Sequence, residues 1–282
     1  MRLGINTFLF TSPFTTESVK HFPKFKKWGF ATVEIPVEDP SHIDPARVKA
    51  AADKAGLAIG SICACMGPGR DFRGTPAEQK TGVDYVKTLI DQAVIMGCPS
   101  IIGPLYSVVG RIGAHTDAEK KQHFNLVVKN LKTLAKYAEK KGVTLCVEPL
   151  NRFETDFLNT VEQGLKLVAA VKSPAVKLHL DTFHMNIEQK NQAAAIKKAG
   201  KLLAHFHACG SDRGTPGNDH IDWPSIAKAL KSIGYKGDVV IESFTTDVKV
   251  IARAAAIWRR MEPTRDEIAT KGAKFLKKTL PV

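Results

Sequence analysis

One theme recurs eight times along the 282 residues of this chain: a short apolar or β-branched run, a loop, and then a longer helical pattern. The candidate strands are Leu3–Phe8, Thr32–Ile35, Ala58–Cys63, Ser100–Ile102, Thr144–Glu148, Val176–Asp181, Ala204–His207 and Val239–Glu242. Alternating strands and helices predict a parallel sheet, and eight such units predict closure into a (β/α)8 TIM barrel. We therefore expect one barrel domain over residues 1–282, although the pattern alone also permits an open, doubly wound sheet.

Helical patterns fill the intervals between these strands. They cover Thr16–Trp28, Pro45–Ala55, Ala77–Met96, Ala118–Lys141, Thr160–Ala170, Gln189–Ala199, Trp223–Ile233 and Val248–Met261. Glycines stand where several of these helices should end, shortly before the next strand, which is the usual position of a left-handed cap. These glycines are Gly29, Gly56, Gly97, Gly142 and Gly234. The segment after Met261 predicts an extra C-terminal helix.

The formal net charge of +13 raises the question of a nucleic-acid partner. The lysines, however, lie mainly on the polar faces of predicted helices such as Glu119–Lys141, or in the tail Lys271–Lys278. Solvated helix faces explain that charge better than a binding surface does. We therefore expect neither a nucleic-acid partner nor a membrane, since no stretch approaches the roughly 20 apolar residues of a membrane span.

The five cysteines are odd in number and contain no Cys-x-x-Cys pair, so they fit neither a disulfide framework nor a zinc ribbon. The chain also begins directly with a strand-like segment, Arg2–Asn6, without a long apolar signal. These features predict a cytoplasmic protein in a reducing compartment.

The chemistry is expected at the C-terminal ends of the strands, where TIM barrels build their active sites. Four successive strands end in metal-competent side chains, namely Glu148, Asp181, His207 and Glu242. A single carboxylate in such a place often pairs with an arginine or caps a helix, but four around one rim predict a metal site. Three carboxylates and one imidazole suit Mn²⁺ best in our interpretation, with Co²⁺ or Mg²⁺ as alternatives, and one divalent metal per chain is expected.

Two of these residues are candidates for proton transfer. Inverting a carbon next to a carbonyl requires an acid/base group on each face of the substrate, and Glu148 and Glu242 end the fifth and eighth strands, across the barrel mouth. A divalent metal would stabilise the enediolate formed after proton loss. Glu34 ends the second strand and is expected to orient other groups.

Four segments carry a resemblance to a known family: Val-Glu-Pro-Leu-Asn-Arg-Phe-Glu at 147–154, Leu-Asp-Thr-Phe-His-Met at 180–185, His-Phe-His-Ala-Cys-Gly-Ser-Asp-Arg-Gly-Thr-Pro-Gly at 205–217 and Val-Ile-Glu-Ser-Phe at 240–244. With nearly the whole chain, they resemble the ketose 3-epimerases, which include the D-tagatose, D-allulose (psicose) and L-ribulose 3-epimerases of the xylose-isomerase-like barrels.

The resemblance implies an isomerase that epimerises free ketoses at C3. It implies that Glu148, Asp181, His207 and Glu242 bind the metal and that Glu148 and Glu242 exchange the C3 proton. It further implies that Glu154, His184 and Arg213 bind the substrate and that the protein forms a homodimer or homotetramer. Phe8, Phe10, Met66, Tyr106 and Phe244 are candidates both for the wall around the distal end of the sugar and for simple core packing.

Three alternatives stay open at this point. Another sugar isomerase on the same barrel, such as an aldose–ketose or hydroxypyruvate isomerase, would use a similar metal and proton transfer. An endonuclease IV-like hydrolase would need several zinc ions, whereas the first, third and fourth strands end in Phe8, Cys63 and Ile102, which are poor ligands. A catalytically silent binding barrel is the third alternative.

Overall fold

The short apolar segments form eight parallel strands in the computed structural model, which describes residues 1–282. The strands pair in chain order, and β8 returns to β1, so the sheet closes into a barrel. Their bounds are β1 Arg2–Asn6, β2 Thr32–Val37, β3 Ala58–Ala64, β4 Ser100–Gly103, β5 Thr144–Val147, β6 Val176–Asp181, β7 Leu203–Ala208 and β8 Asp238–Ile241. The predicted TIM barrel is thereby confirmed, and the open sheet is excluded.

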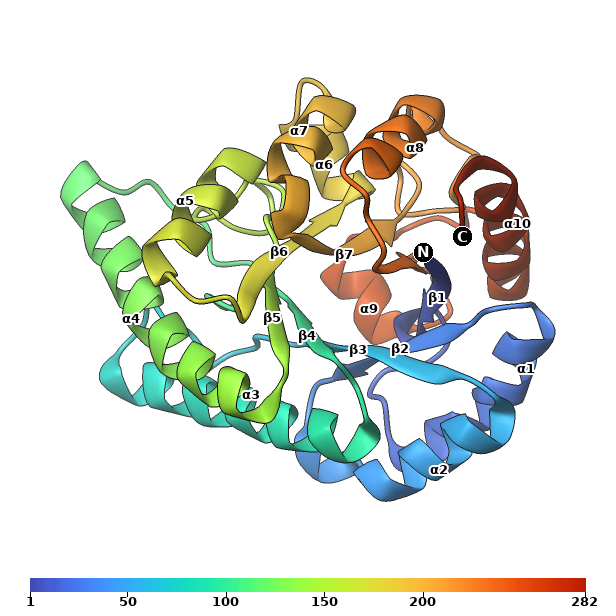
Figure 1. Ribbon diagram of the computed structural model, residues 1–282, viewed down its shortest axis with the longest axis horizontal. Helices are drawn as coiled ribbons and strands as arrows, with labels where there is room; N and C mark the ends of the chain where they lie inside the picture. Colours follow the sequence, from blue (N-terminus) through green and yellow to red (C-terminus); the bar gives the residue numbers. More distant parts are fainter.

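Most of the helices surround the strands on the outside of the barrel (Figure 1). Their bounds are α1 Phe22–Lys27, α2 Pro45–Ala55, α3 Pro76–Met96, α4 Asp117–Lys141, α5 Val161–Val171, α6 Thr182–Glu188, α7 Gln192–Ala199, α8 Trp223–Ser232, α9 Lys249–Ala254 and α10 Arg265–Thr279. Short 3-10 turns occupy Thr7–Leu9, Thr16–His21, Pro40–His42 and Gly200–Leu202. No helix is both long enough and apolar enough to cross a membrane.

Local signals in the sequence explain where the long helices begin and end. Reciprocal capping boxes open α3 at Thr75 and α4 at Thr116, where each threonine pairs with the glutamate three residues later. All five glycines predicted to end helices adopt positive φ; Gly97 and Gly142, for example, have φ of 65° and 68°. Their backbones accept the left-handed cap because no Cβ opposes it.

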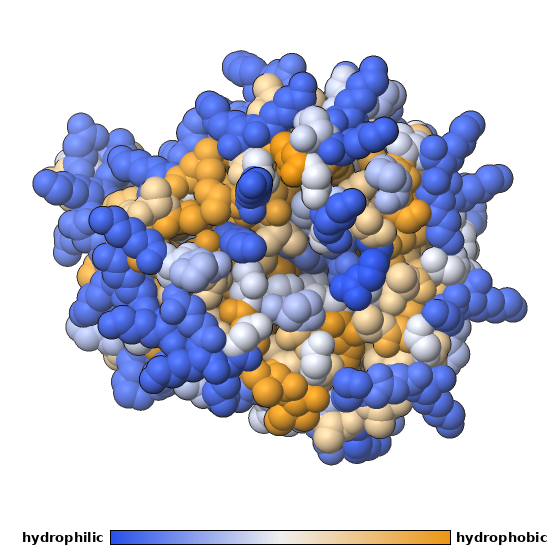
Figure 2. Space-filling model, viewed as in Figure 1, coloured by the Kyte–Doolittle hydropathy of each residue, from blue (hydrophilic) through white to orange (hydrophobic).

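The extra C-terminal helix is also present. α10 packs against β1, α8 and β8, so it covers the seam where the last strand meets the first (Figure 1). On the face shown in Figure 2, hydrophilic residues project around the outer edge and hydrophobic residues lie further in. That distribution fits lysines on solvated helix faces.

Several predicted elements differ from the structure, and the helix expected over Thr16–Trp28 is a 3-10 turn over Thr16–His21 followed by α1. β1 ends at Asn6 rather than Phe8, because the Asn6 side chain accepts the Phe8 N–H and starts a 3-10 turn. The helix expected over Gln189–Ala199 begins at Gln192, and the separate helix α6 precedes it. The helix expected over Val248–Met261 is shortened to α9, and the backbone turns at Ala256, whose φ is 55°.

Candidate metal centre and active site

The four predicted metal ligands gather at one end of the barrel. Glu148 and Glu242 directly follow β5 and β8, whereas Asp181 and His207 belong to the last residues of β6 and β7. Parallel strands bring these positions to the same rim. All four residues are buried: Asp181 and His207 are 0 % exposed, Glu148 4 % and Glu242 7 %.

Ligand atoms of these residues lie close enough to share a cation. One atom each from Glu148, Asp181 and His207 lie within 4.8 Å of one another, and the same holds for Glu34, His207 and Glu242. His207 joins the two sets, with its Nδ1 at 3.2 Å from Glu242 Oε2 and 3.8 Å from Asp181 Oδ2. Glu148 Oε1 and His207 Nδ1 are buried without a hydrogen-bond partner. Unpaired buried acceptors among carboxylates fit a bound divalent metal.

Backbone contacts hold Asp181 in place. Its Oδ1 accepts the Phe183 N–H at 2.6 Å and so caps α6, which turns Oδ2 toward the cluster. This local signal, an aspartate at the strand-to-helix boundary, thus serves both the helix start and the site.

The charges of the cluster strongly perturb its titration. Burial raises the pKa of Glu148 well above its usual value, and the carboxylates of Glu242 and Asp181 act in the same direction. Burial would also raise the pKa of Asp181, but the Arg213 guanidinium and the imidazoles of His207 and His184 outweigh it and hold that pKa low. Burial would lower the pKa of His207, yet Glu34 and Glu242 raise it well above its usual value. Such opposed shifts among neighbours are typical of functional sites.

The three predicted substrate-binding residues lie beside this cluster. Arg213 Nη1 donates to Asp181 Oδ2 at 2.6 Å and to Glu242 Oε2 at 2.9 Å, and its Nη2 is 2.9 Å from His184 Nε2. The Asn151 backbone N–H donates to the other ring nitrogen of His184. The Asn151 side-chain amide donates to Glu154 Oε1 at 2.8 Å. One loop after β5 therefore links Glu154 to His184.

The loop after β7 presents Arg213 in an uncommon conformation. Its φ is 65°, in the left-handed region that few non-glycine residues adopt. The Arg213 backbone is tied on both sides, because its N–H donates to the Gly210 carbonyl and its carbonyl accepts the Phe244 N–H. Its guanidinium lies over the rings of Phe183 and Phe244, at 4.3 and 4.9 Å from their centroids. Surrounding contacts thus fix a strained residue at the site.

A cavity of about 250 Å³ opens onto this cluster and is lined by Glu148, Glu154, His184, Arg213 and Glu242 among others. Asp181 and His207 lie behind it, fully buried. Its remaining wall is mainly apolar and includes Phe8, Met66, Val109, Phe244, Val250 and Ile251. An apolar cavity with a few converging polar groups is the usual form of a small-molecule site.

The five predicted candidates for this wall divide into two groups. Phe8, Met66 and Phe244 line the cavity, which agrees with the prediction that they form a wall of the site rather than core packing alone. Phe10 instead packs against Phe25 and Trp28 in the outer core. Tyr106 is fully buried beside Phe157. Tyr106 still supports the site, because its hydroxyl donates to the backbone carbonyl of Glu148 at 2.8 Å.

A second layer of polar residues lies under the cluster, and most of these residues were not predicted from the sequence. Glu34, Asn6, His179 and His205 are at most 2 % exposed. His179 and His205 each precede a predicted ligand by two residues on the same strand, and residues two apart on a strand share a face. The segments Leu-His-Leu-Asp and His-Phe-His therefore carried a signal for these inward-facing imidazoles.

Burial keeps the cysteine thiols protonated. It raises the pKa of both Cys63 and Cys65, which line the cavity, well above the usual value. None of the five cysteines forms a disulfide. Cys63 and Cys65 therefore pack in the cavity wall as small apolar side chains.

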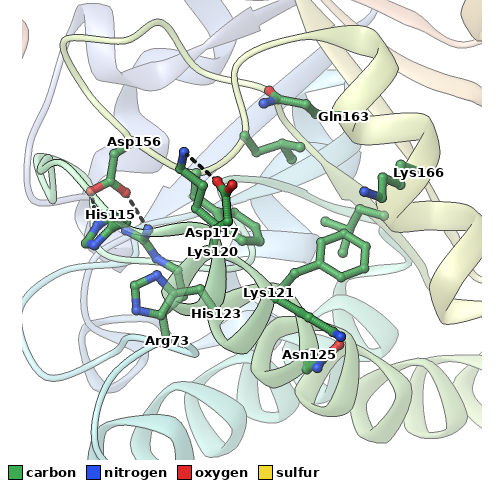
Figure 3. A pocket seen from close by; sticks show the side chains of 14 residues that line it. Arg73, His115, Asp117, Lys120, Lys121, His123, Asn125, Asp156, Gln163 and Lys166 are labelled. Carbon is green, nitrogen blue, oxygen red and sulfur yellow. Dashed lines mark hydrogen bonds and ion pairs between the residues drawn. The ribbon is translucent and has the colours of Figure 1, made fainter.

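A larger cavity of about 670 Å³ lies outside the barrel, lined by residues of α4, α5 and the loops before them (Figure 3). Its two carboxylates are Asp117 and Asp156. Figure 3 shows Asp156 between His115 and Arg73, and it pairs with both. No set of converging metal ligands is found there, which leaves the strand-end cluster as the candidate site.

Comparison with known proteins agrees with this geometry. The family model described as "Xylose isomerase-like TIM barrel" matches residues 22–279. A Synechocystis protein named "Probable ketose 3-epimerase" is 34 % identical, with 99 % of this chain and 96 % of that protein covered. The chain belongs to the ketose 3-epimerase family. It is therefore an isomerase of the xylose-isomerase-like barrels.

Further relatives support the assignment to this epimerase family. The ketose 3-epimerase of Arthrobacter globiformis is 29 % identical, with 99 % of this chain and 97 % of that protein covered. The crystal structure of a Methylomonas D-allulose 3-epimerase in complex with D-allulose has a TM-score of 0.92 and 27 % identity, covering 99 % of this chain and 97 % of that one. The resemblance inferred from the sequence is thereby confirmed.

Proposed function

We propose that this member of the ketose 3-epimerase family inverts C3 of free ketoses and depends on one divalent metal. The substrate class is that of the D-allulose/D-fructose, D-tagatose/D-sorbose and L-ribulose/L-xylulose pairs. One observation carries the proposal: Glu148 and Glu242, which directly follow the separate strands β5 and β8, line the same cavity, and each lies close to His207. An enzyme that inverts a carbon needs such a pair, one group for each face.

In this mechanism the two glutamates exchange the proton. One carboxylate removes the C3 proton from one face, and the other returns a proton to the opposite face of the enediolate. Burial raises the pKa of Glu148 above that of an exposed glutamate, which makes its carboxylate a stronger base for this proton. In the reverse reaction the two residues exchange roles.

The other residues bind and orient the sugar. Arg213 and His184, which face each other across 2.9 Å, and Glu154 supply hydrogen bonds to the hydroxyl groups. The apolar wall with Phe8 and Phe244 packs against the distal end and limits water at the reacting carbon.

Glu148, Asp181, His207 and Glu242 would hold the metal, which we infer to be Mn²⁺, with Co²⁺ or Mg²⁺ as alternatives. When bound, it supplies a positive charge that favours the negative charge developing on the substrate oxygens. The oxygen-rich donor set and the unpaired atoms Glu148 Oε1 and His207 Nδ1 support this assignment.

Product analysis tests the proposal. Purified protein with Mn²⁺ is incubated with D-fructose, D-tagatose or L-ribulose, and the products are separated by chromatography. We expect the C3 epimer of at least one of these ketoses. An aldose product without any C3 epimer would instead identify an aldose–ketose isomerase on the same barrel.

A further inference from the structure

β2 continues to Val37, so Glu34 lies within the strand rather than at its predicted end, and its carboxylate is buried with 0 % exposure. No lysine or arginine pairs with it, and its only ionisable partners are the imidazoles of His205 and His207. Removing a carboxylate from water is costly unless hydrogen bonds replace the lost hydration. Such a group is therefore held by a specific set of donors, and those donors indicate its role.

Each Glu34 oxygen has two partners. Oε1 accepts from Asn6 Nδ2 at 2.7 Å and lies 2.8 Å from His207 Nε2. Oε2 accepts from the Ser61 hydroxyl and lies 2.8 Å from His205 Nε2. The carboxylate thus joins side chains from β1, β3 and β7.

The contact with His207 determines which nitrogen of that ring is free. An ionised carboxylate only accepts hydrogen bonds, so when the His207 ring is neutral, as a metal ligand must be, its proton resides on Nε2. The lone pair of Nδ1 then faces Glu242 and Asp181, where that nitrogen has no hydrogen-bond partner. A metal-binding imidazole needs this arrangement, in which a second group fixes the tautomer and the ring orientation.

Asn6 extends the same control to Glu242. Its Oδ1 accepts the Phe8 N–H at 2.8 Å, which fixes the orientation of the amide group. Its Nδ2 therefore faces both carboxylates and donates to Glu34 Oε1 and, at 3.1 Å, to Glu242 Oε1. The second oxygen of Glu242, Oε2, therefore faces His207 and Arg213.

We propose that Glu34 is the positioning residue of the metal centre: it holds His207 so that Nδ1 faces the cation and, through Asn6, orients the Glu242 carboxylate. This inference rests on the proposed function, because it requires His207 to bind the metal. It adds two residues from the first half of the barrel to a site whose ligands all come from the second half.

Metal affinity tests the inference independently of turnover. Glu34→Gln keeps the shape but offers an amide in place of one acceptor oxygen, and we expect Mn²⁺ to bind about 10- to 100-fold more weakly, as for other losses of such supporting contacts. Affinity is measured by the electron paramagnetic resonance signal of free Mn²⁺. Ser61→Ala is the matched control, because it removes a donor from the same carboxylate without contacting a metal ligand, and its affinity should stay within about threefold of wild type.

A spectroscopic readout separates positioning from a purely structural role. In histidine-labelled protein loaded with diamagnetic Zn²⁺, the ¹⁵N spectrum should show a protonated Nε2 on His207, and this signature should change in Glu34→Gln. Asn6→Ala provides a second variant if Glu34→Gln does not fold: kcat should fall, and Mn²⁺ affinity should fall by less than about tenfold relative to wild type.

The outcomes are distinguishable from failure of the proposed function. A folded Glu34→Gln protein that binds Mn²⁺ within threefold of wild type and keeps the His207 signature overturns the positioning role alone. Equal losses in Ser61→Ala and Glu34→Gln do the same. A wild-type protein that binds no divalent cation overturns the proposed metal-dependent function together with this inference.

Discussion

Replacing Glu148 by glutamine should separate proton transfer from metal binding. Glu148 Oε1 has no hydrogen-bond partner, and Oε2 lies 3.4 Å from His179 Nδ1, so the isosteric amide breaks few contacts. The variant should fold and keep a ligand oxygen, but it cannot accept the proton. Asp181→Asn is the matched control, because Asp181 is proposed to bind the metal without transferring protons.

The expected magnitude follows from the role of the residue. General acid–base catalysis contributes about 10²- to 10⁴-fold, which corresponds to about 2.7–5.4 kcal/mol of transition-state stabilisation. At saturating Mn²⁺, kcat of Glu148→Gln should remain depressed by this factor. The deficit of Asp181→Asn should shrink as Mn²⁺ is added, because weaker metal binding is its main defect.

Solvent exchange provides the sharper assay. In D₂O each single variant keeps the acid/base group of one face, so Glu148→Gln and Glu242→Gln should each exchange the C3 proton of only one epimer, and of opposite epimers. Mass spectrometry of recovered ketoses detects this exchange. If both variants exchange the same epimer, or if excess Mn²⁺ restores Glu148→Gln to wild-type kcat, the two-base reasoning is wrong.

Three further predictions concern the metal, an ion pair and assembly. Chelating the metal should abolish epimerisation and lower the Tm by several degrees, because a ligand present at 100 times its Kd stabilises the folded protein by about 2.7 kcal/mol. Added Mn²⁺ should restore activity and Tm more fully than Mg²⁺. Burial would raise the pKa of Asp156, but the charges and hydrogen bonds of Arg73 and His115 outweigh burial and lower that pKa. The ionised Asp156 therefore stabilises the folded protein fully above the unfolded pKa of 3.8, and this stabilisation is lost as the pH falls through the lowered pKa of the folded state. In urea unfolding Asp156→Asn should therefore cost about 3 kcal/mol at pH 7, because it leaves Arg73 buried without its carboxylate, and a cost that does not shrink toward pH 3 would refute this. Phe153 and Ile112 are 71 % and 60 % exposed on neighbouring loops. If this apolar surface joins the subunits of the expected homodimer or homotetramer, Phe153→Glu should reduce the mass of the assembly in light scattering. An unchanged mass would exclude this surface from the subunit interface.

The sequence predicted the barrel well because the signals for it are local. Apolar runs, helix caps and terminal glycines act within a few residues, and α2 has the predicted bounds Pro45–Ala55. The shortened α9 shows the limit of such patterns. The apolar periodicity of the sequence continues beyond Ala254, but Ala255 lines the cavity and the backbone turns at Ala256, so the helix ends there.

Parts of the candidate site, too, follow from local sequence signals, and other parts depend on contacts between distant residues. The common position of Glu148, Asp181, His207 and Glu242 at one rim was predictable because a strand end in a TIM barrel is a defined place. The role of Asn6 was not, because its contact with Glu242 depends on barrel closure between residues 236 positions apart. The fixed Asn6 amide likewise depends on a 3-10 turn that the strand pattern does not indicate.

That contact at the seam has a consequence for folding. β8 meets β1 only when the barrel closes, and Asn6 reaches Glu242 across this last junction. A partly folded chain in which β8 is still unpaired lacks the contact between the fourth proposed ligand and the Asn6 amide. If Glu242 binds the metal as proposed, high-affinity metal binding requires the closed barrel, and during refolding we expect it to appear only once β8 has paired with β1.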